Sequence, residues 1–165
     1  MTSEHLLHTI PPIYDGNSKI LILGSFPSVK SREVSFYYGH PQNRFWRVLA
    51  AVLGCAVPSS NEEKTALLHS HNIALWDVIK SCDIVGSSDS SIKNVVPNDI
   101  GVILSSCGIR QIYSNGKTSE KLFNKYIKNT VGRDTVALPS TSPANASYNL
   151  ERLTASWSVI KNNIR

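Results

Sequence analysis

No apolar run in the sequence is long enough to cross a membrane, which takes roughly 18 residues. The start, Met1-Thr2-Ser3-Glu4-His5, has neither the basic segment nor the apolar segment of a signal peptide. We therefore expect a cytoplasmic protein that makes no contact with a membrane.

Cysteine is also scarce, because the chain has only three: Cys55, Cys82 and Cys107. They lie far apart and form no CxxC pair, so we expect buried, reduced thiols. This count excludes an iron–sulfur cluster held by cysteines alone. His40 has no second histidine nearby, which disfavours a metal site. We expect no metal and no cofactor.

Acidic residues are the minority among the charged ones, with 12 Asp and Glu against 17 Lys and Arg. The net charge of +5 and the isoelectric point near 9.2 fit a polyanionic partner, although many soluble domains carry as much. Hydrophobic residues make up 41% and charged residues 18%, which indicates a globular chain. The length of 165 residues fits a single domain, residues 1–165.

The sequence does contain an alternation of short apolar runs and amphipathic segments. The runs that predict strands are residues 19–23, 73–78, 109–114 and 135–138. The segments that predict helices are residues 44–53, 64–71, 98–107, 119–130 and 150–164, and residues 86–93 predict a polar surface loop. Asn98 or Asp99 is expected to cap the third helix. This alternation predicts an α/β fold, a three-layer sandwich in which helices flank a central, mainly parallel four-stranded sheet.

The carboxyl ends of the predicted strands carry small, polar or turn-forming residues. These ends are residues 24–28, 76–77, 115–116 and 139–142. Because ligands of parallel α/β sheets bind beyond these ends, their convergence predicts a site, though not yet a reaction. Asp77 is the only carboxylate at such an end inside an apolar run. It is either satisfied by backbone donors or functional.

Two of these segments have local features that suit a site. Gly24 permits close backbone approach and Pro27 stiffens the turn after the first strand, although an ordinary strand exit has the same composition. The loop at residues 139–145 combines two prolines with hydroxyls and small residues. Such a loop could press into a duplex minor groove and contact phosphates. A surface turn is the commoner meaning of that composition.

The segment FYYGHPQN, residues 36–43, is more informative. Three consecutive aromatic rings beside Gly, His and Pro fit a loop that exposes flat rings for stacking on a nucleobase. The alternative is that rings fill the core, which we expect of at least one. His40 is a base, a phosphate contact or a structural donor. Asn43 precedes a predicted helix, so its alternative role is that of an N-cap.

Together these segments resemble the uracil-DNA glycosylase superfamily. Its Gly-x-x-Pro turn after the first strand is matched by GSFPS at residues 24–28, and its Pro-Ser loop after the last strand by PSTSP at residues 139–143. The strings GSFPS, FYYGHPQNRFW, LWDV, SNGK and LPSTSPAN are most similar to the hypoxanthine-DNA glycosylase branch. The HP and NRFW strings are also similar to the mismatch-specific uracil-DNA glycosylases. The resemblance spans nearly the whole chain, from Lys19 to the last helix.

The resemblance implies a monofunctional DNA glycosylase that hydrolyses the N-glycosidic bond of deaminated bases in base-excision repair. Hypoxanthine is the leading substrate, with xanthine and uracil behind it. The partner would be DNA containing such bases, and we expect a monomer. An extruded base would stack on Tyr38, with Phe26 packed below that ring, and would hydrogen bond Asn115 through its edge. The catalytic role falls on Asn43, with Asp77 as the second choice.

The other expected site residues follow from the same motifs. Those expected to bind the substrate are Gly24, Ser25, Phe26, Pro27 and His40, and those expected to bind DNA are Ser140, Thr141, Ser142, Pro143 and Asn145.

Two positions depart from the superfamily pattern. Many members have Asp or Asn at the third position of the first motif, where this chain has Phe26, and several have His before the Pro-Ser loop, where it has Leu138. A neutral amide has no useful proton affinity near neutral pH. Asn43 is therefore expected to hold a water with its carbonyl oxygen and to turn its dipole toward a cationic sugar, so that the base leaves before water attacks.

Two other functions remain compatible with the sequence. The first is an α/β hydrolase of free nucleosides or nucleotides, which would act on inosine itself and would need no DNA loop. The second is a non-catalytic nucleic-acid-binding domain, which would bind in a salt-sensitive way without releasing a base.

Overall fold

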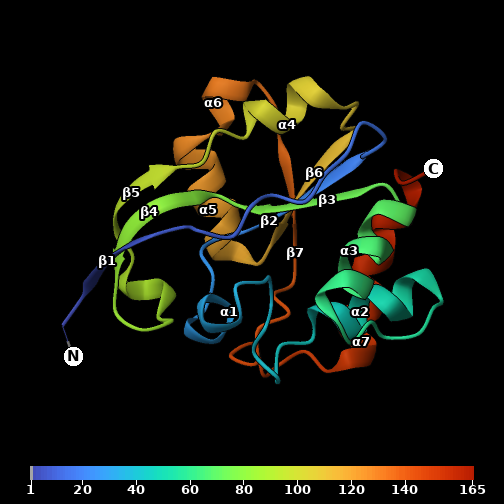
Figure 1. The fold of residues 1–165 in the computed structure, drawn as a ribbon, viewed down its shortest axis with the longest axis horizontal. Coiled ribbons are helices and arrows are strands. Elements are labelled where there is room, and N and C mark those ends of the chain that lie inside the picture. The colour runs from blue at the N-terminus through green and yellow to red at the C-terminus, as the bar shows by residue number, and fades with distance from the viewer. Residues whose placement is uncertain (1) are drawn as a thin grey trace.

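The computed structural model describes residues 2–165 and is built around a sheet of four parallel strands (Figure 1). The strands are β2 (Ile20–Gly24), β3 (Ile73–Asp77), β6 (Gln111–Asn115) and β7 (Thr135–Leu138). Their order across the sheet is β3-β2-β6-β7, and each neighbouring pair is parallel. All five residues of β2 are buried, because this strand is central and covered on both faces. The predicted fold class is confirmed.

Helices cover the two faces of this sheet, as Figure 1 shows. On one face, Leu49 and Trp157 pack in the same cluster as Ile22 of β2. On the other face, Phe123 packs with Leu23. The first face is covered by α2 (Phe45–Leu53), α3 (Asn61–Ser70) and α7 (Leu150–Trp157), and the second by α4 (Gly101–Ser106) and α5 (Lys117–Tyr126). The remaining helical segments are α1 (Val29–Val34), α6 (Lys128–Val131), η1 (Asp89–Ser91) and η2 (Ser158–Asn162).

A second, antiparallel sheet was not expected from the sequence. Its strands are β1 (Glu4–Leu7), β4 (Ile79–Ile84) and β5 (Lys93–Pro97), in the order β1-β4-β5. The outer strands are largely exposed, so they lack the apolar runs that identified the buried strands. The predicted loop at residues 86–93 contains η1, and its last residue already belongs to β5.

The predicted cap of the helix at residues 98–107 is wrong. The amide of Asn98 is buried and donates to the main-chain oxygens of Asp77, at 2.9 Å, and Ile79, at 3.1 Å. It therefore joins the end of β3 to the start of β4. The helix begins only at Gly101, without a side-chain cap.

Three smaller expectations were also inexact. The helix predicted at residues 119–130 divides at Ile127 into α5 and α6, and the last helix ends in the tighter turns of η2. Of the cysteines only Cys82 is buried, where desolvation raises its thiol pKa to about 11, and Cys55 is exposed.

Within residues 2–165, no helix combines the length and the apolar character of a membrane span.

We predict that Asn98→Ala lowers the free energy of unfolding by about 2 kcal/mol or more, because it removes a donor from each of two buried carbonyl groups. Urea denaturation followed by circular dichroism would measure the loss. Asn124→Ala, at an exposed position of α5, is the matched control and should be close to neutral. Equal stability of the two variants would contradict the bridging role of Asn98.

Candidate active site

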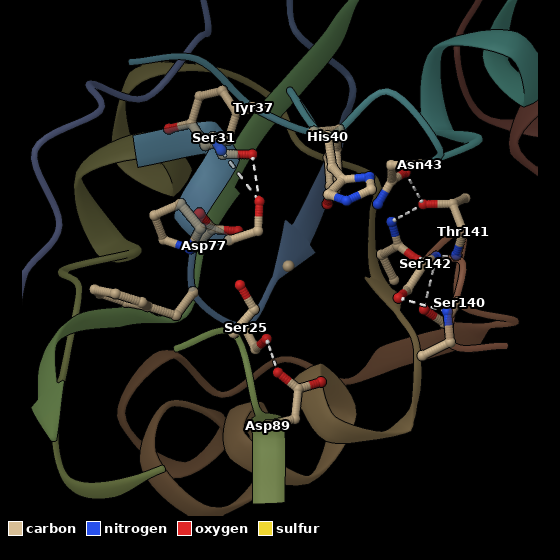
Figure 2. A pocket seen from close by; sticks show the side chains of 18 of the residues that line it. Ser25, Ser31, Tyr37, His40, Asn43, Asp77, Asp89, Ser140, Thr141 and Ser142 are labelled. Carbon is tan, nitrogen blue, oxygen red and sulfur yellow. Dashed lines mark hydrogen bonds between the residues drawn. The ribbon is translucent and has the colours of Figure 1, made fainter. Parts of the chain in front are cut away.

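A cavity of about 350 Å³ opens at the carboxyl edge of the four-stranded sheet (Figure 2). It is lined by the ends of β2, β3 and β6 and by the loops that follow β2 and β7. All the residues expected to bind the substrate or to catalyse the reaction line it, and so do Ser140, Thr141, Ser142 and Pro143. Asn145 does not line it; its amide donates to the main-chain oxygen of Ser140, at 3.0 Å. The segments that the sequence singled out therefore meet in one place.

Gly24 has to be a glycine because of its neighbours in the cavity. A Cβ atom at this position would lie 2.4 Å from Oδ1 of Asp77 and 2.9 Å from the hydroxyl oxygen of Tyr38. Both contacts are shorter than van der Waals distance, so no side chain fits. The expected close approach occurs here between the backbone and two polar side chains.

Tyr38 lines the cavity with its ring stacked on Phe45, at a centroid distance of 4.1 Å and an interplanar angle of 20°. The expectation that Phe26 packs below Tyr38 is wrong. Phe26 instead makes a T-shaped contact with the ring of His8, at a centroid distance of 6.0 Å. Tyr37 is the ring that fills the core: it is buried, and its hydroxyl donates to the main-chain oxygen of Pro11 at 2.8 Å.

The Tyr38 hydroxyl is buried and has no hydrogen-bond partner within the described residues. Burial and then the negative charge of Asp77 raise the pKa of Tyr38 above its ordinary value. The side-chain amide of Asn115 lowers this pKa by a smaller amount. Its geometry to the Tyr38 hydroxyl is not that of a hydrogen bond. The hydroxyl therefore stays protonated at neutral pH.

Asn43 lies just before α2, whose N-cap residue is Arg44. Its Oδ1 accepts two hydrogen bonds at 2.9 Å, one from the main-chain N–H of Phe45 and one from the hydroxyl of Thr141. An N–H can only donate, so this contact identifies the oxygen of the amide. Nδ2 is consequently the end of Asn43 that faces the cavity (Figure 2).

Thr141 connects Asn43 to Asn115. Its hydroxyl accepts from Nδ2 of Asn115 at 3.0 Å, so its one proton is left for Asn43. Its main-chain N–H donates to Oδ1 of Asn115 at 3.1 Å. The expectation that the Asn43 carbonyl oxygen holds a water and points toward a cationic sugar is wrong, because both of its lone pairs are already used and the N–H₂ end faces the cavity. The side-chain amide of Asn115 keeps one N–H that Thr141 does not use.

Arg44 fixes the loop that carries Thr141. Its guanidinium donates to the main-chain oxygens of Ser142, at 2.9 Å, of Asn145, at 3.0 Å, and of Tyr148. Its main-chain N–H donates to the oxygen of Thr141 at 3.0 Å. The guanidinium of Arg44 is thus bound to three carbonyl oxygens and is not free to bind a phosphate.

Asp77 is paired with a residue that the sequence did not identify. Its Oδ2 lies 2.7 Å from Nε2 of His8, and the two side chains are only 5% and 2% exposed. A histidine side chain, and not a backbone donor, therefore satisfies this oxygen. His8 is 69 positions away in the chain and belongs to no motif, so no local signal pointed to it. Oδ1 of Asp77 hydrogen bonds none of residues 2–165 and is directed at Gly24.

The other unexpected lining residues are mostly polar. They include Ser31, Ser87 and Asp89, and Oδ1 of Asp89 accepts a long hydrogen bond of 3.5 Å from the Ser25 hydroxyl (Figure 2). They stand in stretches whose composition is that of ordinary surface loops. His40 lines the cavity with its Nδ1 accepting from the main-chain N–H of Gln42 at 3.1 Å. Among the described residues, no lysine or arginine lines the cavity.

The model of the uracil DNA glycosylase superfamily matches residues 11–162. The chain belongs to the uracil DNA glycosylase superfamily. It is 36% identical over 137 residues to a hypoxanthine DNA glycosylase from Methanosarcina barkeri, which covers 82% of this chain and 85% of the relative. A hypoxanthine DNA glycosylase from Methanosarcina acetivorans is 35% identical over 144 residues, covering 86% and 90%.

The fold of this superfamily member is also found in a solved structure. A solution NMR structure from Methanosarcina acetivorans, described as a candidate uracil DNA glycosylase, superposes with a TM-score of 0.79 at 33% identity and covers 92% of this chain and 94% of that one. The resemblance read from the motifs is therefore confirmed. The individual roles of the cavity residues stay predictions.

We predict that Thr141→Val lowers glycosylase activity at least roughly tenfold, because it removes the hydroxyl that fixes the Asn43 amide while keeping the shape of the side chain. Thr141→Ser keeps the hydroxyl and should restore most of the activity. Single-turnover rates on the same labelled oligonucleotide would compare the two variants. Equal rates for valine and serine would show that the hydroxyl has no part in catalysis.

Proposed function

We propose that this protein is a monofunctional DNA glycosylase that removes hypoxanthine from DNA by hydrolysing its N-glycosidic bond. The observation that carries the proposal is the fixed amide of Asn43, whose Nδ2 faces a cavity that also contains the ring of Tyr38. The curated relatives named as hypoxanthine DNA glycosylases support this substrate. DNA is the expected partner, as for the family.

The charges of the cavity favour a base over a free nucleotide. Its described lining contains the carboxylates of Asp77 and Asp89 and no cationic side chain. A phosphate would lie against these carboxylates without a counter-charge, whereas an uncharged base has no such cost. The phosphates of a DNA substrate stay outside the cavity, where the net charge of +5 favours their approach.

Tyr38 supports the binding of an extruded base. Phe45 holds the ring from one side, so the ring is rigid before the substrate arrives. Extrusion costs a few kcal/mol, and stacking on an aromatic ring returns about 1–3 kcal/mol per base. A ring that is already positioned gives this energy without a further ordering cost.

Asn43 would act as a hydrogen-bond donor. Its Nδ2 can hold the oxygen of a water beside C1′, while Phe45 and Thr141 keep the amide from turning. The base leaves with the electron pair of the glycosidic bond, the water oxygen adds to the cationic C1′, and the surplus proton passes to solvent. This order needs no strong base, which agrees with Phe26 at the motif position where many members have Asp or Asn.

We predict that Asn43→Ala lowers single-turnover excision of hypoxanthine at least roughly tenfold, about 1.4 kcal/mol of barrier, with the fold intact. Asn43→Asp is the sharper variant, because it keeps both accepted hydrogen bonds but loses the donor. It should be as inactive as the alanine variant. An active aspartate variant would mean that an acceptor at this position, and not a donor, handles the water.

The substrate itself is tested with labelled oligonucleotides that each contain one deaminated base, followed by alkaline cleavage of abasic sites. Hypoxanthine should be released fastest, and free inosine should not be cleaved. Borohydride should trap no covalent adduct. Release from inosine, or none from any oligonucleotide, would contradict the proposed function.

We predict that Tyr38→Leu lowers hypoxanthine excision roughly tenfold or more, because the stacking surface is lost. Tyr38→Phe keeps the ring and should retain much more activity than the leucine variant, since the hydroxyl has no hydrogen-bond partner among residues 2–165. The ratio of the two single-turnover rates is the measurement. Equal losses in both variants would argue against stacking.

A further inference from the structure

The two oxygens of the Asp77 carboxylate have different surroundings. Oδ2 is bound by Nε2 of His8, whereas Oδ1 faces the cavity beside Gly24. The main-chain oxygen of Asp77 is held by Asn98, so the residue is fixed at both its backbone and its side chain. A carboxylate that is 5% exposed and keeps one oxygen for the cavity can bind a single donor of a ligand.

This oxygen lies across the cavity from Asn43. Asp77 ends β3 at one side of the sheet, whereas Thr141, the partner of Asn43, follows β7 at the other side. Figure 2 shows Asp77 and Asn43 on opposite sides of the cavity. A purine whose glycosidic nitrogen is near Asn43 therefore turns its far edge, with N1 and the 6-position, toward Asp77.

The far edge is where deamination changes a purine. Hypoxanthine has a hydrogen on N1, whereas N1 of adenine has a lone pair and no hydrogen. An ionised carboxylate is only an acceptor, so at N1 it binds hypoxanthine and repels adenine, whose donor on this edge is the 6-amino group instead. A site that pairs a buried polar group with its substrate rejects analogues that leave the group unpaired.

We propose that His8 is a positioning residue that presents Oδ1 of Asp77 as the acceptor for the N–H of this lactam edge, so that the pair distinguishes hypoxanthine from purines without that N–H. This inference rests on the proposed function. His8 suits the role because its ring packs against two other rings, with centroid distances of 6.0 Å to Phe26 and 6.1 Å to Tyr37. Its main-chain N–H also donates to the main-chain oxygen of Lys80. Without this donor, Oδ2 of the buried carboxylate would have no partner, and the side chain would lose its fixed orientation.

The test compares duplexes that differ in one base, either hypoxanthine or unsubstituted purine, which has a lone pair at N1 and no 6-oxygen. In Asp77→Asn, the amide oxygen can accept from His8, so the N–H₂ faces the cavity. Relative to the unmodified protein, kcat/KM for hypoxanthine should fall at least roughly tenfold, as for a lost buried partner, and kcat/KM for purine should stay equal or rise. Comparing each substrate across variants cancels the difference between the leaving groups.

His8 is tested with two substitutions that separate its donor from its bulk. Glutamine can place an N–H near the position of Nε2, whereas leucine fills the space without a donor. His8→Leu should lose the preference for hypoxanthine over purine, and His8→Gln should restore most of it. Thermal unfolding of both variants shows whether the fold is kept. If leucine prevents folding, the Asp77→Asn result decides alone.

Two results would overturn the inference and leave the proposed function standing. One is an equal loss for both bases in Asp77→Asn, which would place Asp77 at the water or the sugar. The other is an unchanged preference in folded His8→Leu. Failure of the unmodified protein to release hypoxanthine would instead overturn the proposed function.

Discussion

The hydroxyl of Thr141 is the group on which the geometry of the cavity depends most. It is fully buried, and it hydrogen bonds both Asn115 at the end of β6 and Asn43 just before α2. One proton cannot serve two acceptors, so accepting from Asn115 forces Thr141 to donate to Asn43. The direction of each amide follows from that constraint. A neutral side chain thereby acquires a defined orientation without any charged partner.

The cations of this chain serve its architecture as well as its expected substrate. Arg44 is bound by three carbonyl groups of the loop after β7, so the loop and the first turn of α2 form one unit. The cavity keeps its carboxylates and no cationic side chain among its described residues. These carboxylates therefore disfavour an anionic ligand inside the cavity, whereas the net charge of +5 favours the approach of a polyanion.

The second sheet has a direct consequence for the site. β1 pairs with β4, and His8 follows immediately after β1, with its main-chain N–H on Lys80 of β4. This pairing carries the N-terminal segment past the end of β3, where the ring of His8 meets Asp77. The exposed outer strands thus position a buried contact. Their stability is part of the stability of the cavity.

The sequence by itself determined the four parallel strands, the fold class, the family and the set of segments that meet at the cavity, because apolar runs and motifs can be read directly along the chain. The tertiary structure alone decided which end of the Asn43 amide faces the cavity, that Phe45 and not Phe26 supports Tyr38, and that His8 binds Asp77. The first and the third depend on residues distant in sequence, Thr141 and His8, and the second depends on how the loop between Tyr38 and Phe45 folds. A hydrogen-bond direction or a stacking partner is fixed by the neighbours in space, and neighbours in the sequence do not reveal them.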